Sequence, residues 1–491
     1  MFLDKIFSRI MSVGEVKRQS IATFVSQIAF TFIGFLSTMY FAHTVGSSVL
    51  GAYFLFIAYF GIINLVTDGG LGGAAIKRIS EGEEQDEYFT AYFLLRFALT
   101  VLIILGMIVM RPDFVDFDRS GVFEWLLLAL VISFLNGSIS SGIAGRGKMG
   151  IQAAGNFITN VSRIIIQVLA IFLGFGVAGL VGGFIAGLLI GALLKLRFFD
   201  LKLVDFEWRH IKSLSSFSFW LFLTSAGVVL YSHADSIMIG YFLSNSEVGI
   251  YQVVFQFTSL ATIATVAIRT TLWPKVSRWG KSGDMRSVET SLSKAFTFSL
   301  VLAVPLFAGG AVIGDRLLYF FYGAGFATGY YVLIILFFTQ IINVFQYFLT
   351  MYLGALDRQK ESFQATGSAT VANLILNFIL IPLMGIEGAA IATLITMGMN
   401  AFLAWRFLSR RIRVRLERNS LISISKATIL MLVFVGVYRF LVPLSSIWLT
   451  LIPVAIGAMI YIIVILRTDR TIYDEFRDVA LKMGITWPPL L

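Results

Sequence analysis

The sequence has no cysteine, only three histidines and few charged residues of either sign. Without cysteine the chain forms no disulfide, thiol nucleophile or thiolate metal site, and the histidines at positions 43, 210 and 233 lack the spacing of metal ligands. Charged residues make up 13% of the 491 positions and hydrophobic residues 58%. A soluble domain carries about 25% charged residues, so this composition excludes a soluble protein and indicates a polytopic membrane protein.

Apolar stretches long enough to cross a bilayer recur along the chain. A helical span needs about 20 residues, and fourteen such stretches lie between residues 19 and 466. We therefore predict an all-α membrane protein with 14 transmembrane helices. The first 18 residues place apolar side chains at helical spacing between charges and lack a cleavage site, which favours a cytoplasmic interfacial segment over a signal peptide.

The net charge is +10, and the basic residues that produce it are distributed according to the predicted topology. With a cytoplasmic N-terminus, 29 of the 38 basic residues fall in inner segments, whereas the outer loops hold only Arg111, Arg119 and Arg316. The positive-inside rule then predicts that both termini are cytoplasmic. We expect no nucleic-acid partner. The remaining basic residues fall inside apolar stretches, at Arg96, Arg163, Arg269, Lys294, Lys426 and Arg439.

Several segments repeat in order. R-G-K-M-G-I-Q-A-A-G at 146–155 returns as R-Q-K-E-S-F-Q-A-T-G at 358–367, and L-G-A-Y at 50–53 returns as V-G-I-Y at 248–251. The matches predict two parallel six-helix lobes, residues 19–205 and 206–415, related by an axis along the membrane normal. Two further helices occupy 416–466, and an amphipathic cytoplasmic tail occupies 467–491.

Two glycine patterns have structural interpretations. Residues 142–148 fit the phosphate-binding pattern G-x-x-x-x-G-K, but that chemistry requires a preceding strand, and here an apolar helical stretch precedes the glycines. We expect a tight cytoplasmic turn instead. Gly179, Gly183, Gly187 and Gly191 line one face of the sixth span, which predicts close helix packing.

Polar residues inside spans are the main functional signal, because such groups usually face a bundle interior or a wet cavity. Interhelical hydrogen bonding is the competing interpretation for each amide. Arg163, near mid-membrane, is hardest to explain that way. The uncharged candidates share a face with it or form similar stripes on other helices: Asn156, Asn160, Gln167, Gln252, Gln256, Gln340 and Asn343.

Two intramembrane carboxylates are candidates for coupling to an ion. Asp68 and Arg96 lie at similar depth and could form a structural ion pair. Asp235 lies in the outer half of its span, near His233. For Arg269 and Lys294, which lie near the cytoplasmic mouth, the structural alternative is snorkelling to the interface.

Leu50-Gly51-x-Tyr53, Asp68-Gly-Gly-Leu71, Ala75-x-Lys77-Arg78 and the G-x-x-G-A-A segment at 385–390 resemble motifs of prokaryotic polysaccharide-biosynthesis flippases. These belong to the multidrug/oligosaccharidyl-lipid/polysaccharide (MOP) exporter superfamily. The resemblance covers essentially the whole chain. It implies a MATE-like fold whose two lobes surround a cavity with alternating access, in a prokaryotic plasma membrane. It also implies translocation of a polyisoprenyl-phosphate-linked oligosaccharide, a transport function without catalysis.

A phosphate-bearing substrate gives the intramembrane arginines a role, because a guanidinium forms bidentate, charge-assisted bonds with phosphate. We predict that Arg163 and its amide neighbours bind the substrate and that Arg96 and Arg269 add contacts. Membrane lipids are the other expected partners, and we expect a functional monomer. We expect neither a cofactor nor a metal site, and leave open whether Na⁺ or H⁺ couples to transport.

Two other functions are compatible with a polytopic membrane protein. A cation-coupled multidrug exporter of the same superfamily would rely on acidic cavity residues, whereas this chain offers three arginines against two carboxylates. A membrane glycosyltransferase or polymerase needs a sizeable external loop with catalytic groups. The longest outer loop here runs only from about Arg111 to Ser120.

Overall fold

The computed structural model describes residues 15–111 and 121–482, and every regular element in these ranges is a helix. The predicted interfacial segment at 1–18 therefore lies mostly outside the described residues, as does most of the outer loop after Arg111. The helices are α2 (Glu15–Asp68), α3 (Leu71–Ser80), α4 (Gln85–Val109), α6 (Phe123–Gly145), α7 (Met149–Phe172), α8 (Gly176–Leu196), α9 (Trp208–Phe242), α10 (Asn245–Thr258), α11 (Ile263–Ser282), α12 (Met285–Tyr322), α13 (Tyr330–Ala355), α14 (Gln359–Leu408), α15 (Arg418–Leu441), α16 (Ile447–Thr468) and α17 (Arg470–Lys482). Short 3₁₀ turns, η2 (Ser259–Thr262) and η3 (Ala324–Gly329), precede α11 and α13.

The apolar stretches form membrane-length helices, as predicted. Eleven helices of the described chain are long and apolar enough to cross a bilayer, or twelve if α9, which bends by 40° between Leu223 and Ser225, counts as one span. Two of them contain a non-helical glycine, Gly46 in α2 and Gly385 in α14, each with a positive φ. Glycine has no Cβ, so it adopts this backbone conformation without steric cost.

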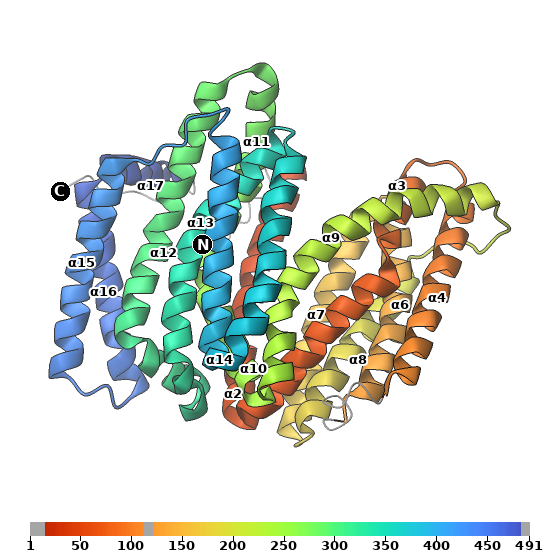
Figure 1. Cartoon of the computed structure of the whole chain (residues 1–491), viewed down its shortest axis with the longest axis horizontal. Helices are drawn as coiled ribbons and strands as arrows, with labels where there is room; N and C mark the ends of the chain where they lie inside the picture. The colour runs from red at the N-terminus through yellow and green to blue at the C-terminus, as the bar shows by residue number, and fades with distance from the viewer. Residues whose placement is uncertain (1–14, 112–120, 483–491) are drawn as a thin grey trace, which may run out of the picture. The chain divides into compact units, whose positions relative to one another are not determined.

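The helices group into two compact units (Figure 1). Unit 1 comprises the described parts of residues 1–39, 253–376 and 387–491, and unit 2 comprises residues 40–252 and 377–386. In unit 1, α12 packs against α11, α13 and α15, and α15 packs against α16. In unit 2, α8 packs against α6 and α7, and α3 packs against α4, α6 and α9. These boundaries differ from those of the predicted lobes, because most of α9 and α10 pack with the N-terminal helices. The division into two lobes therefore stays a prediction.

The two L-G-x-Y-type segments pack on each other within unit 2. The hydroxyl oxygens of Ser47 and Ser246 lie 2.6 Å apart. A Cβ atom at Gly51 would lie 2.9 Å from the backbone nitrogen of Gly249, and one at Gly249 would lie 3.0 Å from the nitrogen of Gly51. Real Cβ atoms do not approach so closely, so both repeat copies need glycine where their backbones meet.

The glycine face of α8 packs on α7, as the spacing predicts. A Cβ atom at Gly187 would lie 2.8 Å from Cβ of Arg163, and one at Gly183 would lie 2.9 Å from the backbone nitrogen of Gln167. Leu173–Phe175 separate the two helices. The small residues therefore bring the polar face of α7 against α8.

The C-terminal helix α17 is amphipathic. Ile472 and Tyr473 are buried, whereas Phe476 and Arg477 are exposed. Glu475 accepts a hydrogen bond from Lys294 at 2.7 Å, which ties α17 to α12. Snorkelling of Lys294 to the interface stays a prediction, to which the structure adds this ion pair. Residues 483–491 of the predicted tail lie outside the described chain.

Candidate functional site

The polar face of α7 divides into two environments. At its cytoplasmic end, by the predicted orientation, the amide of Asn160 donates to the carbonyl of Asn156 at 3.0 Å within the helix. One turn beyond Arg163, Gln167 is 2% exposed and donates to the hydroxyl of Tyr53 at 3.0 Å and to the carbonyl of Leu180 at 2.7 Å. Both amide hydrogens of Gln167 are therefore used inside unit 2. This geometry favours an interhelical joint at Gln167 over a substrate contact.

Arg163 lies on α7 between these environments. It is half-buried, with its Cβ packed beside Gly187. Its Nε atom is buried and has no hydrogen-bond partner, and no carboxylate in the described chain forms an ion pair with its guanidinium. A half-buried guanidinium without an acidic partner is costly in an apolar surrounding. Arg163 therefore has the character expected of an anion-binding group.

Lys195 is a functional candidate that the sequence analysis missed, because it was counted with the cytoplasmic loop. It is fully buried in the last turn of α8. Its ammonium donates to the hydroxyl of Ser140 at 2.7 Å and to Oδ1 of Asn156 at 3.3 Å, and its stem packs on Gly155. The helical spacing indicates this burial: Lys195 follows Gly191 by four residues and so lies on the same face of α8, the face that packs on α7.

Asp68 and Arg96 form the ion pair that their depth predicts. Nη1 of Arg96 lies 3.5 Å from Oδ1 of Asp68 and donates to the hydroxyl of Tyr92 at 2.7 Å. Tyr92 in turn donates to Ser141 at 3.2 Å. The guanidinium is 3% exposed and fits against Gly137, where no side chain could be accommodated. This arrangement supports a structural role for Arg96 and gives Asp68 a fixed counter-charge.

Asp235 has different surroundings. It is 8% exposed, and its two oxygens accept hydrogen bonds of 2.6 Å each from the hydroxyl of Tyr251 and from the amide of Asn377. Both donors are neutral groups. His233, two residues earlier on α9, packs against Gly61. Asp235 is thus a buried carboxylate with both oxygens hydrogen-bonded, on a different helix from Asp68.

The remaining candidates are held by local contacts. The guanidinium carbon of Arg269 lies 4.6 Å from the ring centroid of Tyr347, a cation–π distance, in unit 1. The side-chain amide of Asn343 donates to Oε1 of Gln340 at 2.9 Å on α13. The other two amides also have partners. Oε1 of Gln256 accepts a hydrogen bond from the hydroxyl of Thr38 at 3.2 Å, and Nε2 of Gln252 donates one to the hydroxyl of Ser236.

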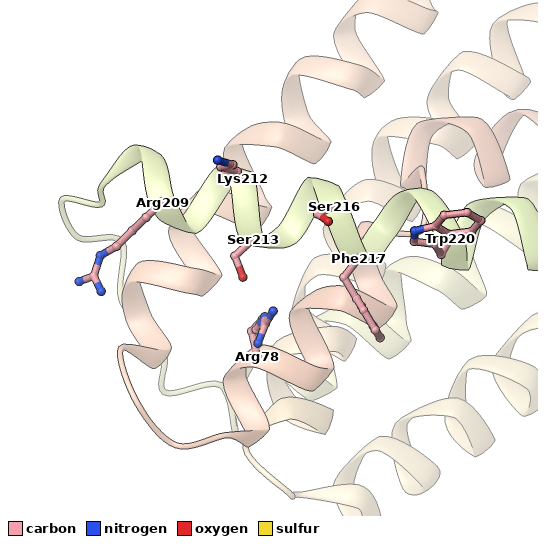
Figure 2. A pocket seen from close by; sticks show the side chains of 7 residues that line it. All are labelled: Arg78, Arg209, Lys212, Ser213, Ser216, Phe217 and Trp220. Atoms are coloured by element: carbon pink, nitrogen blue, oxygen red, sulfur yellow. The ribbon is translucent and has the colours of Figure 1, made fainter.

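A cavity of about 430 Å³ lies within unit 2, between α3 and the first turns of α9 (Figure 2). It is separate from the polar clusters above, and the sequence analysis did not predict it. Its lining combines basic, hydroxyl and aromatic side chains, at Arg78, Arg209, Lys212, Ser213, Ser216, Phe217 and Trp220.

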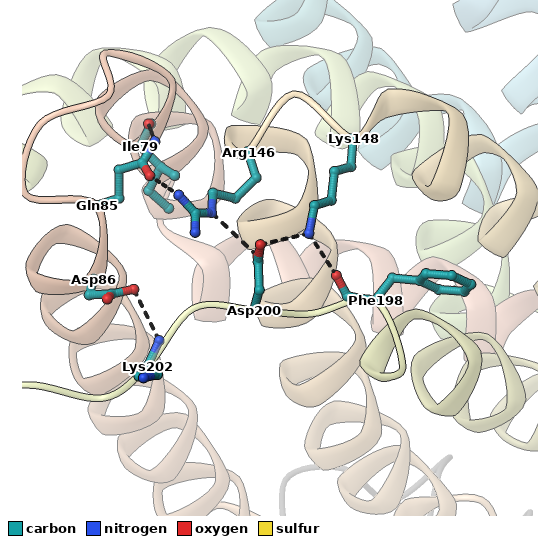
Figure 3. A network of polar contacts seen from close by, with 8 residues as sticks. All are labelled: Ile79, Gln85, Asp86, Arg146, Lys148, Phe198, Asp200 and Lys202. Atoms are coloured by element: carbon teal, nitrogen blue, oxygen red, sulfur yellow. Dashed lines mark hydrogen bonds and ion pairs between the residues drawn. The ribbon is translucent and has the colours of Figure 1, made fainter.

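The glycine-containing turn between α6 and α7 forms a charged network with the segment after α8 (Figure 3). Asp200 accepts from Lys148 at 2.8 Å and from Arg146 at 3.3 Å, and Lys148 also donates to the carbonyl of Phe198 at 3.0 Å. These bonds, mainly that of Lys148, hold the pKa of Asp200 below its ordinary value although partial burial opposes them. Helices flank this turn on both sides, as the structural interpretation predicts, so the strand that a phosphate-binding loop requires is missing here.

Comparisons with known proteins agree with this fold. The family model described as polysaccharide biosynthesis protein matches residues 41–330. The probable low-salt glycan biosynthesis flippase Agl15 of Haloferax volcanii is 29% identical over 479 residues, which cover 97% of this chain and 100% of that relative.

Two solved structures resemble the fold of the chain. The lipid II flippase MurJ, in an inward closed conformation, has a TM-score of 0.76 at 18% identity and covers 93% of this chain and 98% of its own. An inward-facing multidrug resistance MATE family transporter of the MOP superfamily has a TM-score of 0.65 at 16% identity, covering 78% and 94%. With the family match spanning more than half of the sequence, the chain belongs to the polysaccharide biosynthesis protein family, and its fold is similar to those of MurJ and the MATE transporter.

Proposed function

We propose that this protein is a flippase that moves a polyisoprenyl-(pyro)phosphate-linked oligosaccharide from the cytoplasmic to the outer leaflet of a prokaryotic plasma membrane by alternating access. The observation that carries the proposal is Arg163, a half-buried arginine without an ion-pair partner in the described chain. A phosphate supplies the missing anion and pairs with a guanidinium through two parallel hydrogen bonds. The similarity to a probable glycan biosynthesis flippase supports the substrate class.

The proposed membrane topology has fourteen crossings. A helix of 54 residues such as α2 would be about 80 Å long, well beyond a hydrocarbon core of about 30 Å. Splitting α2 at Gly46 and the 50-residue α14 at Gly385 adds two spans to the twelve counted with α9 as one. The result is an even number, so both termini lie on the same side, which the positive-inside rule assigns to the cytoplasm. The two six-helix lobes and the monomeric state belong to the same proposal.

Within this proposal Arg163 binds the phosphate, and Asn156 and Asn160 contact the hydroxyl-rich head of the substrate. Lys195 positions Asn156, because its ammonium bonds the Asn156 side chain from the opposite helix. The other predicted substrate contacts, which the proposal retains, are Arg269, Gln256, Gln340, Asn343 and Gln252. Arg96 and Gln167 act chiefly by holding helices together.

Asp235 is the proposed coupling group. A buried intramembrane carboxylate can exchange a proton or Na⁺ as the protein changes state. Asp68 is less suited to this role because Arg96 already supplies its counter-charge. The same property of Asp235 is the observation that favours the second candidate function, a cation-coupled multidrug exporter.

Sidedness of the lipid-linked glycan in cells tests the proposal. In cells lacking the protein, the glycan should accumulate on the cytoplasmic leaflet and be protected from a membrane-impermeant reagent in intact cells. Complementation with the native chain should restore labelling, and Arg163→Ala should not, at equal protein level. A normal distribution in the deletion cells, together with sensitivity to cationic drugs, would support the exporter instead.

A further inference from the structure

The cavity between α3 and α9 is lined by three cationic side chains, of which one has no acidic partner among the described residues. Arg209 is paired with Glu84 and Glu207 and points away from Arg78 (Figure 2). Lys212, in contrast, forms no hydrogen bond or ion pair with another described residue. Its charge is therefore available to a ligand.

Arg78 contributes a second donor to this cavity. Its Nη1 atom pairs with Glu81 at 3.0 Å, whereas its Nη2 atom bonds no other described residue. The hydroxyl of Ser213 points from α9 toward Arg78 (Figure 2), and Ser216 lies on the same face one turn later. Neither serine side chain bonds another described residue. An ammonium, an unused guanidinium edge and two hydroxyls form a donor set suited to the oxygens of a phosphate.

The aromatic residues around the cavity place it at the edge of the membrane. Trp208 and Trp220 are 74% and 66% exposed, and tryptophan concentrates at the level of lipid headgroups. Phe217 lines the cavity and lies under the ammonium of Lys77, whose Nζ is 4.2 Å from the ring centroid. The volume of about 430 Å³ falls within the roughly 300–1,000 Å³ of ligand pockets.

We propose that this cavity binds the phosphate of an anionic glycerophospholipid from the leaflet that the positive-inside rule assigns to the cytoplasm. Lys212, Arg78, Ser213 and Ser216 contact the phosphate, and Phe217 and Trp220 contact the glycerol and upper acyl chains. The site is distinct from Arg163 and independent of what the protein transports. A bound lipid would bridge α3 and α9, the helices that enclose the cavity.

Native mass spectrometry of the delipidated full chain, titrated with defined lipids, tests the proposal. Phosphatidylglycerol should bind in preference to phosphatidylcholine, and the Lys212→Gln/Ser213→Ala variant should weaken its binding by roughly tenfold, because two donors to a charged oxygen are removed. Lys212→Arg should bind as the native chain does. Lys202→Gln, which removes an exposed lysine elsewhere in unit 2, is the matched control and should also leave binding unchanged.

Competing ligands identify the source of the phosphate. Millimolar inorganic phosphate should not displace phosphatidylglycerol, and a polyisoprenyl phosphate should bind no more tightly than phosphatidylglycerol at this cavity. Displacement by inorganic phosphate, or a Lys212-dependent preference for the polyisoprenyl phosphate, would overturn the assignment to a membrane phospholipid. Equal phosphatidylglycerol binding by the native chain and the double variant would overturn the site itself.

Discussion

The ammonium of Lys195 lies 3.3 Å from Oδ1 of Asn156, so a fully buried cation on α8 fixes a polar side chain on α7. Its other partner is the hydroxyl of Ser140 on α6, at 2.7 Å. Three helices of unit 2 are therefore joined through one charged group. The contact lies two turns from Arg163 along α7 and holds the cytoplasmic end of the proposed substrate site.

Replacing Lys195 with methionine should uncouple this joint. Methionine keeps an unbranched stem beside Gly155 but leaves Ser140 and Asn156 without their donor, a loss of about 1–3 kcal/mol of stability. We also expect a lower rate of glycan translocation, measured on vesicles with equal amounts of folded protein. Lys202→Met, at an exposed lysine, is the control. Native stability and native transport in Lys195→Met would contradict the positioning role.

The Asp68–Arg96 pair should show energetic coupling. Arg96 is buried, so Asp68→Asn leaves a cation without its counter-charge, a more damaging change than removing both charges. In a double-mutant cycle of Asp68→Asn and Arg96→Gln, thermal unfolding in detergent should give a coupling energy of at least about 1 kcal/mol. Additive effects of the two substitutions would show that the pair contributes no mutual stabilisation.

The pattern of long apolar runs was sufficient to predict an all-helical membrane protein. In lipid, the backbone N–H and C=O groups of such a run must form their hydrogen bonds with one another, as they do within a helix. The Asp68–Arg96 pair and the packed glycine face of α8 also followed from depth and helical spacing. The environment of Lys195 did not, because the sequence alone does not distinguish a charge in the last turn of a helix from a charge in the loop that follows. The cavity between α3 and α9 depends on how two distant segments pack, which spacing along one helix cannot reveal.

Acid should selectively weaken the Asp200 network. The folded-state pKa of Asp200 is below its ordinary value, so its ionised form stabilises the fold at neutral pH, and this contribution is lost as the pH falls through the lowered pKa. The group is largely exposed, which limits the effect to about 1 kcal/mol or less. Thermal unfolding of Asp200→Asn should therefore differ from the native chain at pH 7 and converge with it toward pH 3. A difference that stayed constant over this range would rule out the ionised pair as its cause.

Asp235→Asn should remove the response to an ion gradient. The amide keeps the shape of the carboxylate beside Tyr251 and Asn377 but cannot bind a proton or carry a negative charge. Translocation by this variant in vesicles with an imposed Na⁺ or proton gradient should no longer depend on the gradient. Translocation by the folded fraction of Asp68→Asn should still depend on it. Tyr251→Phe tests whether the hydroxyl alone matters. Full gradient dependence in Asp235→Asn would move the coupling role elsewhere.

The most direct test of the central claim is translocation by the purified chain in vesicles that carry a fluorescent polyisoprenyl-pyrophosphate oligosaccharide. Loss of signal to a membrane-impermeant quencher reports movement between leaflets. The native chain and the Lys426→Ala control, at an exposed lysine of α15, should translocate the lipid, and Arg163→Ala should be reduced at least about tenfold, because it loses a charge-assisted phosphate contact. Translocation by Arg163→Ala at the native rate, or no protein-dependent translocation by the native chain, would contradict the account.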